Sequence, residues 1–163
     1  MGALLVMLEQ NNSVPSAHVP DPQRNKILAT LFQSGRQDWE PHLEPCELTP
    51  GQVLYEPGHQ PEYLYFPTTA LVSLLFPTAS GSPAEIATIG DHGIVGIGLL
   101  LGGVVVTPSR AVVRSGGMGF RLRAQMMRDE LNRATPVMDV MLHYAQTLIR
   151  QMVQNVGHLP ATS

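Results

Sequence analysis

Positive charge is missing from a long central part of this chain. Between Arg36 and Arg110 the sequence contains no lysine or arginine, although it contains eight acidic residues there. From Arg110 onward it has seven arginines and only three acids. The chain is therefore acidic in its middle and basic in its last third, and its net charge of -3 gives no global argument for nucleic-acid binding.

Cysteine and long apolar runs are also scarce. The single cysteine, Cys46, excludes an internal disulfide and a thiolate zinc site within one chain, and it fits a reducing compartment. The longest apolar run, residues 93–106, contains five glycines and is shorter than the roughly 20 residues that a membrane helix needs. Residues 1–8 lack the basic residues of a signal peptide. We therefore expect a cytoplasmic protein without membrane contact.

Clustered catalytic or metal-binding residues are missing too. The histidines are scattered singly, whereas a cupin-type metal site needs histidines that converge on one ion, so His59 and Glu62 near a turn are weak candidates. A haem sensor with Cys46 or a histidine as axial ligand is an alternative that no spacing supports. The sequence has no Gly-x-Ser-x-Gly turn. We expect a non-enzyme with no catalytic residues, no metal and no cofactor.

The middle of the chain is divided into short apolar segments by turn residues such as Pro50-Gly51 and Pro57-Gly58. The expected strands are 43–48, 52–55, 63–66, 70–76, 85–89, 110–114 and 119–122. Many short strands at this spacing are typical of a double-stranded antiparallel β-roll or jelly roll. Hydrophobic residues make up 44% of the chain, which is enough for a packed core.

Helices are expected on both sides of the strands. Apolar residues at helical spacing predict a helix over 24–33, a short helix over 124–133, and a long helix from Pro136 to about Asn155. In the long helix, apolar residues recur at alternating steps of three and four, at Met138, Met141, Ala145, Leu148 and Met152. This heptad pattern favours a coiled coil between two subunits, while a core helix packed on its own domain is the alternative. If the helix forms a coiled coil between two subunits, Leu148→Asp should give monomers, because it would place two carboxylates opposite each other.

The chain therefore divides into three parts. Residues 1–23 contain three prolines and are expected to be a flexible N-terminal segment. Residues 24–134 form the β-roll domain with its flanking helices, and residues 135–158 form the dimerisation helix.

Several stretches in this order are similar to one known family. They are the glycine-punctuated hairpin of residues 48–58, the strands 63–67 and 71–75, and the run Ile89-Gly90-Asp91-His92-Gly93-Ile94-Val95-Gly96. Together they resemble the cyclic-nucleotide-binding effector domain of the Crp/Fnr transcription regulators. The resemblance implies a homodimeric sensor domain with a small-molecule effector. In that family a helix-turn-helix module follows the long helix, whereas this sequence ends at Ser163, so we expect no DNA contact from the chain as it stands.

The resemblance also identifies the ligand-binding cassette, and two positions depart from it. The family's glutamate, which accepts a hydrogen bond from the ribose hydroxyl, is replaced by Ile97 between Gly96 and Gly98. The family's phosphate-binding arginine falls at Ser109 when Ala111 and Val113 are aligned on the inward face, and Arg110 then points outward, because successive strand residues face opposite sides.

These departures predict a degenerate cassette that does not bind cAMP or cGMP. A desolvated phosphate needs a charged partner, and an unpaired buried hydroxyl costs roughly 1–3 kcal/mol. The glycines from Gly93 to Gly103 offer a backbone anion cradle, or simply tight turns. Two alternatives stay open: a functional nucleotide site that uses Arg110, and a ligand-free dimerisation or interaction module.

Overall fold

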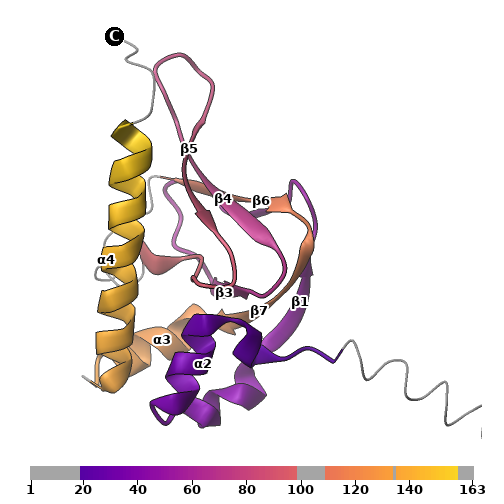
Figure 1. Ribbon diagram of the computed structural model, residues 1–163, viewed down its shortest axis with the longest axis vertical. Helices are drawn as coiled ribbons and strands as arrows, with labels where there is room; N and C mark the ends of the chain where they lie inside the picture. Colours follow the sequence, from indigo (N-terminus) through magenta and orange to yellow (C-terminus); the bar gives the residue numbers. More distant parts are fainter. Residues whose placement is uncertain (1–18, 99–108, 134, 158–163) are drawn as a thin grey trace, which may run out of the picture.

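Within the part of the chain that the structure describes, seven antiparallel strands form two sheets that face each other as a β-roll (Figure 1). The computed structural model describes residues 19–98, 109–133 and 135–157. One sheet has the order β1-β7-β3, with strands Glu44–Leu48, Gly117–Arg123 and Tyr63–Pro67. The other has the order β2-β6-β4-β5, with strands Val53–Tyr55, Arg110–Ser115, Leu71–Phe76 and Ala84–Ile89. The predicted fold class is confirmed, and all seven expected strands are present within two residues of their predicted ends.

Helices flank the roll on both sides in the sequence. A short 3-10 turn η2 (Pro22–Arg24), helix α2 (Lys26–Gln33) and a 3-10 segment η3 (Arg36–His42) precede the strands. Helices α3 (Ala124–Leu131) and α4 (Pro136–Gly157) follow them, and α4 runs along one side of the roll (Figure 1). The segment η3 was not predicted, and it buries Trp39, which is only 3% exposed. None of the helices in the described part of the chain is long and apolar enough to cross a membrane.

Side-chain alternation in the strands builds the core. In β6, Ala111 and Val113 are buried, while Arg110 and Arg114 are exposed. In β7, the inward residues are Phe120 and Leu122. This period of two is expected for strands with one buried face. The inner faces of both sheets are therefore apolar, and the charged residues of β6 lie on the outer surface.

The buried side chain of Asn25 joins α2 to the roll. Its Oδ1 accepts hydrogen bonds from the backbone N–H groups of Ile27 and Leu28, so Asn25 caps the helix. Its Nδ2 donates to the carbonyl oxygens of Pro67 and Gly93, at 2.8 and 3.0 Å. All of its hydrogen-bonding capacity is thus used inside the protein, and α2 is fixed to the end of β3 and to the loop after β5.

Helix α4 packs one apolar stripe against its own domain. This stripe consists of Val137, Met141, Tyr144 and Leu148, which are all buried within the single chain. Two of the five predicted dimer-interface residues, Met141 and Leu148, are therefore unavailable to a partner, which corrects that part of the prediction. Apolar residues next to the heptad positions make the apolar stripe of α4 broad. The heptad pattern alone therefore does not determine which side of that stripe packs against the roll of the same chain.

Candidate functional site

The loop after β5 leads into the predicted cassette and is held by three separate elements. The backbones of Tyr65 in β3 and Val95 exchange two hydrogen bonds, of 3.1 and 2.8 Å. The hydroxyl of Tyr144 in α4 donates to the carbonyl oxygen of Ile94 at 3.1 Å. Asn25, which caps α2, donates to the carbonyl oxygen of Gly93, as described above. The entrance to the cassette is thus fixed to α2, β3 and α4 together.

Tyr144 packs so closely on this loop that the loop needs a glycine. A Cβ atom at Gly93 would lie 2.5 Å from the Tyr144 hydroxyl oxygen and 2.9 Å from Ile89 Cγ2. Burial raises the pKa of Tyr144 to about 12, so its phenol stays protonated at neutral pH. The protonated phenol is the form that donates to Ile94. Tyr144 was not predicted from the sequence, although its spacing from Met141 and Leu148 places it on the same helix face.

The beginning of the cassette is apolar. Gly96 has a φ of +106°, which side-chain-bearing residues rarely adopt, and an added Cβ there would lie 2.9 Å from Leu64. Ile97 is half-buried and packs against the hydrophobic core, and Gly98 is also half-buried. Ile97 has no side-chain acceptor for a ligand hydroxyl. Residues 99–108, including Gly102 and Gly103 of the expected anion cradle, lie outside the described residues.

Ser109 and Ala111 face the interior of the roll, in the register that the alignment on Ala111 predicted. Ser109 is 3% exposed, and its hydroxyl lies 3.4 Å from the hydroxyl of Tyr55 in β2. This distance is long for a bond between two hydroxyl groups. Burial raises the pKa of Tyr55, whose side chain is neutral at pH 7. The polar groups that face inward here are therefore uncharged, and Tyr55 is a site candidate that sequence reasoning missed.

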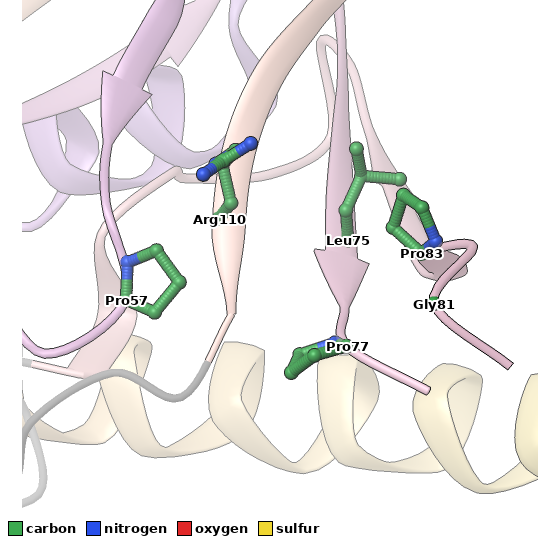
Figure 2. Close-up of a pocket in the computed structure, with 6 residues that line it drawn as sticks. All are labelled: Pro57, Leu75, Pro77, Gly81, Pro83 and Arg110. Carbon is green, nitrogen blue, oxygen red and sulfur yellow. The ribbon is translucent and has the colours of Figure 1, made fainter. Parts of the chain in front are cut away.

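Arg110 points away from the roll interior. Its Nε and Nη2 both lie 2.9 Å from the Glu56 carboxylate, and about half of each side chain is exposed. Figure 2 shows Arg110 beside Pro57, Leu75 and the β4–β5 connection, where it lines a surface pocket of about 210 Å³. The guanidinium thus forms an ion pair with a glutamate on the outer surface of the roll.

The other arginines of the strands follow the same arrangement. Arg114 is paired with Glu85, Arg121 with Glu44 and Arg123 with Glu62, at N–O distances between 2.8 and 3.7 Å. The sequence has no lysine or arginine from residue 37 to 109, so the segment 99–108 contributes no cation either. The cationic side chains of the strands therefore all lie outside the roll.

Metal and thiol chemistry find no support in the described residues. Within residues 19–98, 109–133 and 135–157, no three histidine, cysteine or carboxylate side chains are close enough to hold a metal ion. Cys46 is half-buried, and burial raises the pKa of its thiol, which keeps it protonated at neutral pH. A protonated, partly buried thiol is a poor nucleophile and a poor metal ligand.

Comparison with known proteins identifies the architecture. Neither a family model nor a curated protein matches this sequence. A cyclic nucleotide-binding domain from Methylobacillus flagellatus is 15% identical with a TM-score of 0.57, and the match covers 76% of this chain and 70% of that one. The chain has the fold of a cyclic-nucleotide-binding domain.

Two further solved structures with this fold are regulatory proteins. The sensor domain of the transcriptional regulator DNR from Pseudomonas aeruginosa is 13% identical, with a TM-score of 0.57, 85% of this chain and 95% of that one covered. A regulatory subunit of a cAMP-independent protein kinase A from Trypanosoma cruzi, bound to guanosine, is 19% identical, with a TM-score of 0.59. The latter match covers 79% of this chain and 47% of that one, so the chain spans about half the length of that subunit.

Proposed function

We propose that this chain is a non-enzymatic sensor domain of a Crp/Fnr-type transcription regulator and that its roll does not bind cAMP or cGMP. The decisive observation is that the strand arginines lie on the outer faces and are paired with acids, while Ser109 occupies the inward position next to Ala111. A phosphate inside the roll would then have no cationic partner, and pairing a desolvated anion with charge is what makes its burial favourable.

Calorimetry on the purified chain tests this proposal directly. We expect no measurable binding of cAMP or cGMP at micromolar concentrations. Arg110→Ala serves as a control, because its side chain lies outside the roll and the variant should behave as the wild type does. A low micromolar dissociation constant for cAMP that Arg110→Ala abolishes would contradict the proposal and would favour an ordinary nucleotide site with a different β6 register.

A ligand without phosphate is the second candidate for this roll. The hydroxyls of Tyr55 and Ser109 are held together only by a long contact, so both remain able to donate to or accept from an uncharged ligand. The guanosine-bound kinase subunit supports this candidate. Guanosine has the base and ribose of cyclic GMP but no phosphate, so it is the matched uncharged ligand for the binding experiment. Binding of guanosine that Ser109→Ala and Tyr55→Phe weaken would support it, and an absence of guanosine binding would favour a ligand-free interaction module.

We further propose that the chain forms homodimers through α4, along a stripe that differs from the predicted one. Leu142, Ile149 and Val153 are 49%, 54% and 66% exposed, which is high for apolar side chains on one helix face. The half-buried residues Ala145 and Met152 lie between them, and 142, 145, 149 and 152 follow heptad steps. Met138, also half-buried, extends this stripe toward the start of the helix.

Sedimentation of two aspartate variants tests this interface. Ile149→Asp should give monomers at concentrations where the wild type is dimeric, because a two-fold contact brings the two carboxylates together. Thr147→Asp is the matched control, since Thr147 is exposed on α4 but lies far around the helix from Ile149. A monomeric wild type, or equal sedimentation of the two variants, would contradict a dimer through this stripe.

A further inference from the structure

Two side-chain amides of α4 are bonded to the backbone of β5. Strand β5 is the last strand in the order β2-β6-β4-β5, so one of its edges has no neighbouring strand among the residues that the structure describes. Gln151 Nε2 donates to the carbonyl oxygen of Thr88 at 3.3 Å, and Asn155 Nδ2 donates to that of Ile86 at 2.8 Å. These amides give two carbonyl oxygens of the end strand side-chain partners on α4, and an end strand is where another strand could otherwise add to the sheet.

The spacing of the two bonds fits a helix and a strand that run in opposite directions. Gln151 and Asn155 are separated by four residues, or about 6 Å along a helix. Thr88 and Ile86 are separated by two residues, or about 6.6 Å along a strand. Both bonds form together only when the amides face β5, since a shift of one residue turns a helix side chain by about 100°. The pair therefore specifies one rotation and one register of α4.

The pair also accounts for a polar residue in an apolar pattern. Asn155 continues the series of Met141, Leu148 and Met152 at the position where the heptad pattern predicts another apolar side chain. Its amide is needed there because the side chain meets a backbone carbonyl instead of the apolar core.

We propose that Gln151 and Asn155 form a register lock that holds the C-terminal half of α4 on the edge of β5 and fixes the rotation of the helix. The lock determines which α4 side chains face outward, among them Ile149 and Val153. Release of the lock frees this half of the helix to turn or separate from the roll. The lock rests on its own contacts, whereas its consequence for assembly rests on the homodimer proposed above.

Isosteric acid variants provide a sharp test. Asn155→Asp and Gln151→Glu keep the shape of each side chain but replace a donor with a carboxylate that repels the carbonyl oxygen. At pH 7 we expect hydrogen exchange of the end of α4, residues 149–157, to be about tenfold faster in the double variant than in the wild type. Gln154→Glu is the matched control, because Gln154 is exposed and its position on the helix is turned by about 100° from that of Asn155.

Acidification supplies the second readout. The protonated carboxyl group can again donate to the carbonyl, so the lock favours the neutral form and raises the pKa of the introduced acids above the ordinary value of about 4. The stabilising bond is therefore present at low pH and is lost as the pH rises. At about pH 3.5, the exchange ratio between the double variant and the wild type should fall toward one. A merely volume-filling role for these side chains would show no such rescue.

Two outcomes overturn the lock: exchange at pH 7 no faster than in Gln154→Glu, or a difference from the wild type that persists unchanged at pH 3.5. Sedimentation of the double variant then tests the link to assembly. We expect its dimer dissociation constant to be at least severalfold higher than that of the wild type. A wild type that is monomeric contradicts the homodimer alone, because the exchange measurement judges the lock in either state.

Discussion

The inner and outer faces of the roll differ in charge. Ala111 and Val113 of β6 face inward, as does Ser109 directly before the strand, whereas Arg110 and Arg114 on the outer side are each bound to a glutamate. A one-residue alternation thus separates an uncharged interior from an ionic surface. The number of arginines near a binding fold therefore says little about anion binding until the register of the strand is known.

Helix α4 shows the same contrast between neighbouring residues. Leu148 is buried in the chain's own core, and Ile149, the next residue, is more than half exposed. The two side chains are chemically alike, so their positions on the helix alone decide whether they stabilise the monomer or remain available for a partner. Substitutions at such neighbouring positions should therefore have effects of very different size.

The largest effect is expected for Leu148→Asp. Placing a carboxylate among the buried residues of α4 removes the packing of a leucine and buries an unpaired charge, and we expect a loss of at least about 4 kcal/mol in the free energy of unfolding. Ile149→Asp should change that free energy by less than about 1 kcal/mol when both variants are measured as monomers. Urea denaturation at low protein concentration checks both values. Equal destabilisation by the two substitutions would contradict the assignment of the inner and outer stripes.

The second effect concerns the buried phenol of Tyr144 at high pH. Its pKa is raised to about 12 in the folded protein, above the value of about 10 in an unfolded chain. The neutral phenol therefore stabilises the fold below pH 10, and this contribution of about 2–3 kcal/mol is lost as the pH rises from 10 to 12. Tyr144→Phe should show a shallower loss of stability over this range in denaturation experiments at successive pH values. A variant with the wild-type slope would place the titrating group elsewhere.

A third, smaller effect is expected for Gly93→Ala. The added methyl group would meet the Tyr144 hydroxyl and Ile89, and overpacking of this kind costs about 1–3 kcal/mol. In a Tyr144→Phe background the hydroxyl is missing, so the same substitution should cost less. A double-mutant cycle measured by thermal denaturation gives the coupling between the two residues. Additive effects would mean that Tyr144 does not press on the loop.

Much of this fold could be predicted from the sequence because the residues that mark its turns are recognisable without knowledge of distant contacts. Proline and glycine pairs such as Pro50-Gly51 mark the turns, and alternation in residues 109–114 determines which side of β6 faces inward. The exposed position of Arg110 follows from that alternation. The amino-acid sequence by itself is therefore sufficient to predict that Ser109 faces inward and Arg110 outward.

Features that depend on contacts between distant elements could not be predicted in this way. The segment η3 buries Trp39 without a helical repeat of apolar residues, and Tyr55 meets Ser109 across 54 residues of sequence. The apolar stripe of α4 is wide enough for both a core and a partner, so periodicity alone assigned Met141 and Leu148 to the wrong side. Only packing against the roll distinguishes the two sides.

The smallest effect is expected on the outer face, for Arg110→Ala. The variant loses an ion pair with Glu56 in which both side chains are about half exposed, and such pairs contribute less than about 1 kcal/mol because water already solvates both charges. Denaturation in low and high salt checks this value, since screening should remove most of the remaining difference between variant and wild type. Glu56→Gln is the matched partner variant and should behave alike. A loss well above 1 kcal/mol that salt does not reduce would mean that Arg110 is buried in solution, and the separation between an uncharged interior and an ionic surface would then fail at the residue that matters most for anion binding.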